Sequence, residues 1–167
     1  MNFIDEAYLE VRAGDGGSGA SSFRREKYIP FGGPDGGDGG KGGDIFFKVN
    51  QNSNTLIDFQ NRKVFEAKNG QRGSGKNKSG SAGENLIISV PKGTVIYDNL
   101  TNEELIDCTD ENTDYLIVRG GEGGHGNARF KSSTNRAPRK STPGFKGEIR
   151  SLRLELKSLA DVGLVGF

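Results

Sequence analysis

The sequence predicts a mainly β protein, in which a bundle of glycine-rich polyproline II segments is joined to a small antiparallel β-unit. Three observations predict this fold class. Glycine recurs at every third residue between Gly33 and Gly43, and short apolar runs with strand-like alternation are separated by turn residues. In addition, no window of the sequence has a long pattern with the 3.6-residue period of a helix.

The glycine-rich run at residues 32–44 is the most specific of these signals. It contains two series with a spacing of three residues: Gly33, Gly36, Gly39 and Gly42, and then Gly37, Gly40 and Gly43. Three residues make one turn of a polyproline II helix, and a glycine stripe on such a helix lets another backbone pack closely against it. A flexible linker is the competing interpretation. Further glycine-rich segments occur at 14–19, 70–83 and 120–126, which favours ordered segments that pack together. Five prolines are too few for collagen.

The strands are predicted from the apolar runs. Residues 2–12 alternate between apolar and polar side chains, which is the period of a half-buried strand. Further strands, bounded by turn residues, are predicted at 44–49, 85–90, 94–98, 104–108, 115–119 and 152–157. Pro91-Lys92-Gly93 is expected to form a tight connection between two of them.

The last residues, 159–167, form a nearly continuous apolar run of the kind found in buried parallel strands. We therefore expect one domain at 1–158 and the beginning of a second at 159–167. A buried final strand of the same domain is the alternative.

Composition limits the class of protein further. A chain of 167 residues suits one domain with a short additional segment. The single cysteine, Cys108, provides no disulfide framework, and its place at the end of an apolar run predicts a buried or edge thiol rather than a nucleophile. The sequence has no signal peptide and no apolar run of transmembrane length, so we expect a soluble, cytoplasmic protein.

The charges are segregated, although the net charge is only +1. Residues 94–118 carry acidic side chains and no Lys or Arg, whereas residues 23–28, 62–78 and 119–153 are basic blocks. Basic blocks within glycine-rich sequence favour a polyanionic partner. Aromatic residues lie within two of these blocks, which points to nucleic acid. An ordinary solvated surface is the alternative.

Three segments of the chain resemble the Obg family of ribosome-associated GTPases. They are FIDEAYLEVRAGDGGSGASSFRREKYIPFGGPDGGDGGKGGDI (3–45), GNARFKSSTNRAPR (126–139) and LADVGLVGF (159–167). The resemblance implies an Obg fold, with glycine-rich polyproline II helices packed side by side and joined to a small antiparallel β-barrel-like dome. It also implies that 159–167 is the first strand of the GTPase domain, where Gly166 and Phe167 begin an incomplete phosphate-binding loop.

The resemblance implies that the full-length protein is a Mg²⁺-dependent GTP hydrolase that acts in large ribosomal subunit assembly and in stress-linked control. The 167 residues lack the Lys and the Ser/Thr of the phosphate-binding loop. We therefore expect these residues alone to be no enzyme, with no catalytic residue, no cofactor and no metal. His125 is the only histidine and lies among glycines, without a partner for catalysis nearby in sequence.

The resemblance further implies that the chain binds the large (50S) ribosomal subunit and its RNA. The expected partners are this subunit and the protein's own GTPase domain; we expect a monomer and no membrane contact. Arg and Lys would neutralise phosphates, and Arg and aromatic faces would stack on exposed bases. The expected RNA-binding residues are Arg24, Arg25 and Lys27 in one loop, Arg129, Lys131, Arg136, Arg139 and Lys140 in another, and Lys76 and Lys78 in a third, weaker site.

A calcium-binding β-roll module is the alternative function. Residues 39–47 fit the pattern G-G-x-G-x-D-x-U-x, and Asp35, Asp38 and Asp44 could supply ligands. No second copy of the nine-residue repeat follows, although that architecture requires stacked repeats. The dinucleotide fingerprint G-x-G-x-x-G also occurs at Gly14–Gly19 and at Gly121–Gly126, but it carries no weight in a chain with 27 glycines.

Overall fold

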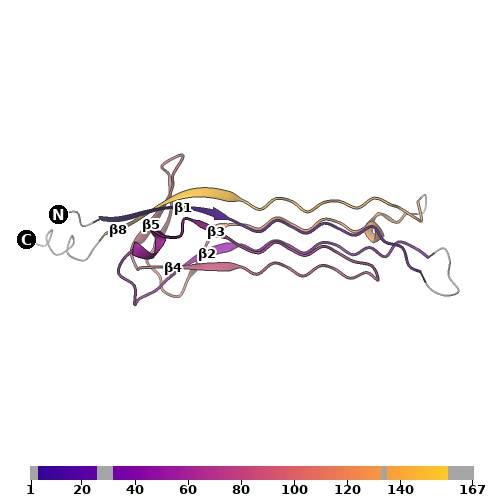
Figure 1. The fold of residues 1–167 in the computed structure, drawn as a ribbon, viewed down its shortest axis with the longest axis horizontal. Helices are drawn as coiled ribbons and strands as arrows, with labels where there is room; N and C mark the ends of the chain where they lie inside the picture. Colours follow the sequence, from indigo (N-terminus) through magenta and orange to yellow (C-terminus); the bar gives the residue numbers. More distant parts are fainter. Residues whose placement is uncertain (1–3, 26–31, 133–134, 158–167) are drawn as a thin grey trace, which may run out of the picture.

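The computed structural model describes residues 4–25, 32–132 and 135–157, and these residues form an elongated molecule (Figure 1). The β-strands gather at one end, which we call the dome. From the dome, long backbone segments run side by side to the other end. We call this part the stalk and define it as residues 13–25, 32–44, 67–85, 119–132 and 135–148.

The dome contains two sheets. In the larger sheet the strand order is β3-β1-β8-β5-β6, and in the smaller it is β4-β2-β7. The strands are β1 (Ile4–Arg12), β2 (Ile45–Val49), β3 (Val64–Glu66), β4 (Leu86–Val90), β5 (Thr94–Asp98), β6 (Glu104–Cys108), β7 (Asp114–Val118) and β8 (Ile149–Lys157). Two short 3₁₀ helices, η1 (Ile57–Phe59) and η2 (Asn127–Phe130), complete the described elements.

Every strand predicted within the described residues is confirmed, with boundaries shifted by at most a few residues. The turn at Pro91–Gly93 is confirmed too: the N–H of Thr94 donates to the C=O of Pro91 (3.2 Å), and Gly93 has a left-handed φ of 88°. Strand β3 was not predicted, because three residues with one buried side chain, Phe65, give no readable alternation.

The prediction of an antiparallel, barrel-like unit is wrong in two respects. The sheets are mixed, because β1 pairs with β3 in parallel and β2 pairs with β4 in parallel. They also form two open sheets in the described part of the chain, rather than a closed barrel. The connections through the stalk explain the parallel pairs.

Three excursions from the dome make up the stalk within the described residues. Residues 13–44 leave β1 and return to β2, residues 67–85 leave β3 and return to β4, and residues 119–148 leave β7 and return to β8. Strands β1, β3 and β7 therefore run towards the stalk, and β2, β4 and β8 run away from it. Two outgoing strands that are neighbours must be parallel, and so must two returning ones.

An apolar cluster of the described residues joins the two sheets. Leu152, Leu154 and Leu156 of β8 alternate with more exposed residues and belong to the same buried cluster as Ile45 and Phe47 of the smaller sheet. Fully burying a side chain of this size stabilises a fold by about 1.5–3 kcal/mol. The dome therefore supplies the hydrophobic core that the glycine-rich stalk lacks.

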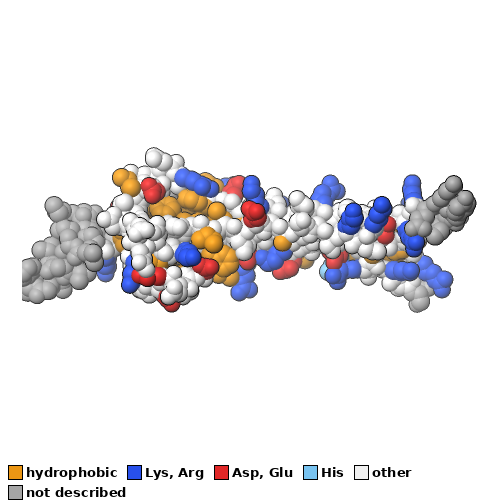
Figure 2. All heavy atoms as spheres, turned by 90° about the horizontal axis from the view of Figure 1, so that it is seen from below, with side chains coloured by type: hydrophobic (Ala, Val, Ile, Leu, Met, Phe, Trp, Pro, Cys, Tyr) orange, Lys and Arg blue, Asp and Glu red, His pale blue; other side chains and the backbone are white. Residues whose placement is uncertain are grey.

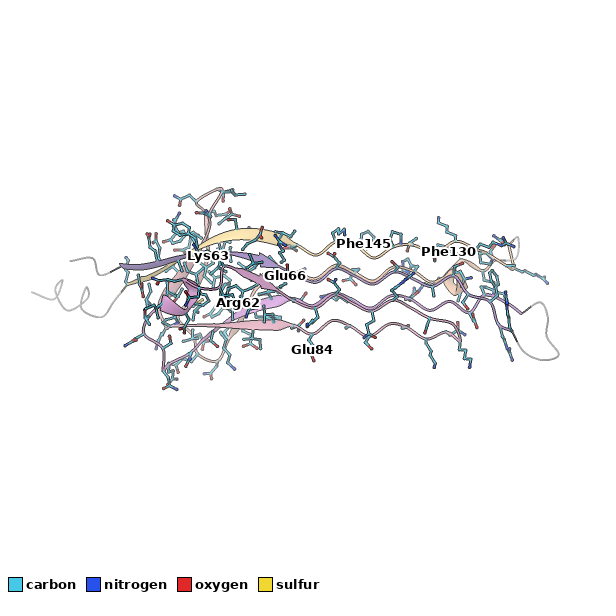
Figure 3. The ribbon with its side chains drawn as sticks, in the orientation of Figure 1. Arg62, Lys63, Glu66, Glu84, Phe130 and Phe145 are labelled. Carbon is cyan, nitrogen blue, oxygen red and sulfur yellow. The ribbon has the colours of Figure 1, made fainter. Side chains whose placement is uncertain are left out.

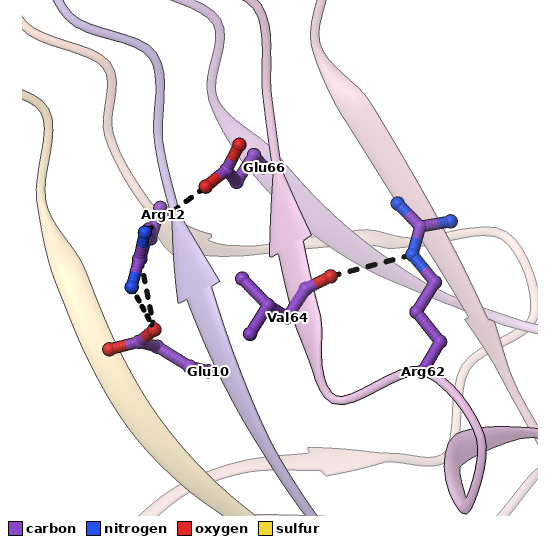
Figure 4. Close-up of polar contacts among 5 residues, drawn as sticks. All are labelled: Glu10, Arg12, Arg62, Val64 and Glu66. Carbon is purple, nitrogen blue, oxygen red and sulfur yellow. Dashed lines mark hydrogen bonds and ion pairs between the residues drawn. The ribbon is translucent and has the colours of Figure 1, made fainter.

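Ion pairs reinforce the edge of the larger sheet (Figure 4). The guanidinium of Arg12 on β1 lies 2.7 Å from the carboxylate of Glu10 and 3.2 Å from that of Glu66 on β3. Arg62 donates from Nε to the C=O of Val64 (3.4 Å), and its guanidinium lies 4.3 Å from the ring centroid of Phe65. Arg12 thereby ties the short β3 to β1, the strand with which it pairs in the described part of the chain.

Backbone hydrogen bonds in the stalk recur every three residues. The N–H groups of Gly14, Gly17 and Ala20 donate to the C=O groups of Gly43, Gly40 and Gly37 (2.9, 2.8 and 2.9 Å). Between other segments, Gly39 donates to Gly124 and Gly42 to Gly121, Gly70 donates to Asp15 and Gly73 to Ser18, and Gly80 donates to Asp38 and Gly83 to Lys41. The three-residue glycine series of the sequence are thus the positions where stalk segments join, both within the first excursion and between different excursions.

The stalk glycines are needed because their neighbours are backbone atoms. A Cβ atom added to Gly17 would overlap the C=O of Gln71, and one added to Gly39 would overlap the C=O of Gly17. Only a residue without a side chain allows such a close approach of two backbones. The competing interpretation of these runs as a flexible linker is wrong, since the segments are hydrogen-bonded to one another.

Among the described residues, the structure contains no helix that is both long enough and apolar enough to span a membrane.

Candidate nucleic-acid interface

The described parts of the three excursions meet near the end of the stalk that lies farthest from the dome (Figure 1). We call these parts the first tip (residues 22–25 and 32–35), the second tip (74–78) and the third tip (128–132 and 135–141). Figure 2 shows Lys and Arg side chains along the stalk and gathered around this end. The basic blocks that are far apart in the sequence therefore meet in space.

Strand-like pairing holds the base of the first tip. Phe23 forms an isolated antiparallel bridge with Pro34, and the N–H of Arg24 donates to the C=O of Gly33 (2.9 Å). The N–H of Asp35 donates to the C=O of Ser22 (2.9 Å). This pairing fixes the backbone immediately before Arg24 and Arg25, whose side chains are exposed.

The second tip is a tight turn whose shape depends on Asp35 of the first. Lys76 and Asn77 both have left-handed backbones, with φ of 62° and 56°. Asn often adopts this conformation, whereas Lys seldom does. Asp35 holds the turn from outside: its Oδ2 accepts a hydrogen bond from the N–H of Lys76 (3.0 Å), and its C=O accepts one from Asn77 (2.7 Å).

Asn127 joins the first and third tips. Its buried side chain accepts a hydrogen bond from the N–H of Gly36 (2.8 Å) and donates to the C=O groups of Ser22 (2.9 Å) and Pro138 (3.1 Å). Asn127 was not among the residues predicted from the sequence. A signal existed, because Asn127 lies three residues after Gly124 and continues its series, and its N–H donates to Ala20 as the ladder requires (2.9 Å).

Two hollows lie between the tips. The larger, with a volume of about 570 Å³, lies between the first and third tips. Its lining includes five of the predicted RNA-binding residues, which are Arg24, Arg25, Lys131, Arg136 and Arg139. The smaller, about 470 Å³, lies between the first and second tips and includes Arg24, Arg25 and Lys76 together with Asp35. Arg24 and Arg25 thus contribute to both hollows.

Comparison with known proteins relates this architecture to a family. The sequence model of the GTP1/OBG family matches residues 4–158. The chain belongs to this family. Proteins called GTPase Obg from Psychrobacter sp. (strain PRwf-1) and from Magnetococcus marinus are each 55% identical to it over 166 residues. The matches cover 99% of this chain but 41% and 43% of those relatives, so the chain spans about two-fifths of their length.

The resemblance to Obg proteins found in the sequence is therefore confirmed, and the structure adds where the predicted residues lie. Arg129 does not reach either hollow. Its Nε lies 2.6 Å from Oδ2 of Asp38, whose Oδ1 accepts a hydrogen bond from the N–H of Gly126 (2.9 Å). Partial burial alone would raise the pKa of Asp38, but the bonds from Gly126 and Arg129 outweigh it and hold this pKa below its usual value.

Two further cations of the Obg chain also lie outside the hollows. The ammonium of Lys140 lies 5.2 Å from the ring centroid of Phe130, within reach of a cation–π interaction. Lys78 is exposed at the end of the second tip, where its C=O accepts the hydrogen bond of Ser74 (2.9 Å). Lys27, Gly166 and Phe167 lie outside the described residues, as does the predicted second domain at 159–167.

The acidic residues considered as calcium ligands have separate structural roles in this Obg chain. Asp38 binds Gly126 and Arg129, whereas Asp44 binds the ammonium of Lys41 (2.5 Å) and the N–H of Gly120 (2.7 Å). Within the described residues, no group of three His, Cys, Asp or Glu side chains could hold a metal ion. The structure therefore offers no support for the calcium module.

Proposed function

We propose that this Obg chain binds the large ribosomal subunit and that the cationic end of its stalk contacts ribosomal RNA. The observation that carries the proposal is the convergence of Arg24 and Arg25 from the first tip with Lys131, Arg136 and Arg139 from the third on one hollow. Membership of the GTP1/OBG family supports it, since the family resemblance implies ribosome association.

The physical chemistry of the tips suits RNA. Each Arg or Lys that neutralises a phosphate releases condensed counterions, which makes binding strongly dependent on salt. Phe23 lines both hollows and offers a face on which an unpaired base can stack. The glycine-rich stalk carries these side chains far from the dome on segments whose backbones nearly touch, so the stalk is thin enough to enter a narrow channel.

We also infer that the stalk segments are polyproline II helices. Two observations support this inference. Backbone hydrogen bonds between neighbouring segments recur every three residues, and Gly126 has a φ of −73° and a ψ of 161°. These values lie close to those of polyproline II. Carbon-13 chemical shifts of the stalk residues report φ and ψ, and shifts typical of β-strands or helices would contradict the inference.

For the full-length protein we propose a Mg²⁺-dependent GTPase of the cytoplasm that acts in ribosome assembly and stress-linked control. The names of the two relatives, GTPase Obg, support the hydrolase activity. In this proposal, the 167 residues dock the full-length protein on the large ribosomal subunit. Measuring GTP hydrolysis by the full-length protein with and without large subunits tests it.

The first experiment is co-sedimentation of the 167-residue chain with purified large ribosomal subunits at low and at physiological salt. We expect binding that weakens steeply as salt increases. No binding at low salt would overturn the proposal that these residues dock on the subunit.

A pair of double variants locates the interface. Arg136→Glu with Arg139→Glu should weaken binding about tenfold or more and reduce the slope of log K against log[salt] by about 1.4–1.8, because two phosphate contacts are lost. Lys48→Glu with Lys63→Glu makes the same change of net charge in the dome. Figure 3 shows that Lys63 lies at the opposite end of the molecule from Phe130. Equal losses in both double variants would mean that overall charge, and not the tips, determines binding.

A further inference from the structure

Asp35 is a buried carboxylate at the centre of the cationic end of the stalk. The residue is only 7% exposed. Its Oδ2 accepts the hydrogen bond from Lys76 (3.0 Å), but its Oδ1 is buried and has no hydrogen-bond partner. It is the only such side-chain atom found among the described residues. A buried acceptor without a donor costs free energy, so an unpaired one at a candidate interface requires an explanation.

Asp35 is one of the residues that line the smaller hollow. Ser22, Phe23, Arg24 and Arg25 line this hollow from the first tip, with Gly75, Lys76 and Asn77 from the second. A methyl group added to Gly75 would lie 2.8 Å from Oγ of Ser22 and 3.8 Å from Oδ1 of Asp35. Residue 75 therefore lies beside the unpaired oxygen, and a methyl group there would crowd the hydroxyl of Ser22.

A carboxylate in this position opposes the binding of phosphate. If the hollow took only the RNA backbone, Asp35 would repel the anion that Arg24, Arg25 and Lys76 attract. An oxygen that can only accept hydrogen bonds calls for a donor from the ligand. In nucleic acids the exocyclic amino groups of bases supply such donors, and Asp accepts from the amino group of cytosine.

The other walls suit the rest of a nucleotide. Phe23 and the guanidinium planes of Arg24 and Arg25 can stack on an unpaired base, as proteins that bind single-stranded RNA do. The cations can at the same time neutralise the phosphates on either side of that base. A volume of about 470 Å³ lies within the range of small-ligand pockets.

We propose that the smaller hollow takes one unpaired RNA base that carries an amino group, which donates a hydrogen bond to Oδ1 of Asp35. The inference rests on the proposed function, because the ligand is RNA, and it deepens that function by assigning base recognition to one tip. Cytosine, adenine and guanine each carry an amino group that can donate this hydrogen bond. Uracil has no amino group, and its only base donor, the ring N3–H, lies between two carbonyl oxygens that the carboxylate repels.

The test compares short oligocytidylate and oligouridylate of equal length, binding to the 167-residue chain at constant salt and measured by fluorescence anisotropy. These two pyrimidines differ in an amino group against a carbonyl oxygen. We expect the cytosine oligomer to bind about tenfold more tightly, as one charge-assisted hydrogen bond allows. Equal affinities would overturn the inference.

Two variants connect the preference to the hollow. Asp35→Asn keeps the shape of the side chain. Its amide oxygen stays on the N–H of Lys76, so the amide nitrogen, a donor, takes the place of Oδ1, and the preference for cytosine should disappear. Gly75→Ala adds a methyl group 3.8 Å from Oδ1, where it also crowds the hydroxyl of Ser22, and should do the same. Gly33→Ala is the control, because its methyl would meet only Nζ of Lys131 at 3.6 Å, in the larger hollow.

The outcomes separate this inference from the proposed function. If a thermal melt shows that Asp35→Asn is unfolded, the base preference is measured with Gly75→Ala alone. A preference for cytosine that survives in the folded variants would overturn the inference. Binding to large subunits without any base preference would support the proposed docking through phosphate contacts and would overturn only the proposal that the smaller hollow binds a base. A preference that depends on Asp35, without any binding to large subunits, would keep the hollow and reject the ribosome as its target.

Discussion

The glycines of the stalk differ from one another in what surrounds them. Gly39 faces the C=O of Gly17 on a neighbouring segment, whereas Gly33 at the first tip faces only the flexible end of Lys131. Both belong to the same three-residue series in the sequence. Spacing alone therefore does not tell which glycine is required, because the requirement comes from the segment that packs against it.

We expect Gly39→Ala to destabilise the fold by about 2–4 kcal/mol, because its methyl cannot avoid a backbone carbonyl. The melting temperature should fall by about 4–16 °C for a chain of this length. Gly33→Ala should be nearly neutral. Circular dichroism melts measure both, and equal melting temperatures would show that the stalk segments can move apart at little cost.

Cys108 gives a second prediction for a single residue. It is fully buried at the end of β6, as its place in the sequence suggested, and burial together with the nearby Asp107 raises the pKa of its thiol to about 12. Only a thiolate reacts rapidly with alkylating reagents. Iodoacetamide at about pH 8 should therefore leave the folded protein unmodified and label it once it is unfolded in denaturant. Stoichiometric labelling of the folded protein would contradict this expectation.

Between elements, two aspartates connect different excursions of the stalk. Asp38 of the first excursion binds Gly126 and Arg129 of the third, and Asp44 binds Gly120 of the third as well as Lys41. Partial burial would raise the pKa of Asp44, but the bonds from Lys41 and Gly120 outweigh it and lower this pKa, as happens for Asp38. Both carboxylates therefore stabilise the fold in their charged form.

The stabilisation by these two carboxylates should be complete above their usual pKa of 3.8 and be lost as the pH falls through the lower values of the folded state. Urea unfolding between about pH 5 and pH 2 measures this loss. Asp38→Asn and Asp44→Asn should flatten the acid side of the profile. A Glu104→Gln variant on β6 serves as the control, and an identical acid slope in all three variants would refute the assignment.

The sequence allowed most strands to be predicted, because a strand half-buried on one face repeats every second residue. The alternation of Leu152, Leu154 and Leu156 is buried as expected. Pairing was not predictable in the same way. Parallel neighbours such as β1 and β3 result from the direction in which distant excursions leave the dome, and no local pattern records that direction.

In the molecule as a whole, the stalk replaces a hydrophobic core by backbone bonds between distant segments. We expect the amides of Gly14, Gly17, Gly39 and Gly42 to exchange slowly with deuterium, comparably to those of β1 and β8, because each donates to a neighbouring segment. Neighbouring amides without such bonds should exchange faster, which gives protection with a three-residue period. Rapid exchange throughout residues 14–43 would mean that the stalk opens independently of the dome.

The sequence predicted the cations of the candidate interface, but not the hydrogen-bonded residues that hold the tips together. Blocks of Arg and Lys identified the tips, since charge is visible in sequence, and five of those residues line one hollow. Asn127 and the free oxygen of Asp35 were not identifiable as parts of the site. Their roles depend on hydrogen bonds between excursions separated by many residues, such as that from Asn127 to Ser22.

The pairing of β1 with β8 has a consequence for how the chain is made. Ile4 lies opposite Lys157 and Arg12 opposite Ile149, so the first described strand obtains its main partner only from the last. During synthesis neither the larger sheet nor the stalk can be completed until β8 has emerged, because the third excursion supplies backbone bonds to the first. Folds dominated by such long-range pairing form slowly. The larger sheet and the full set of backbone bonds in the stalk should therefore form late, once the third excursion has been synthesised.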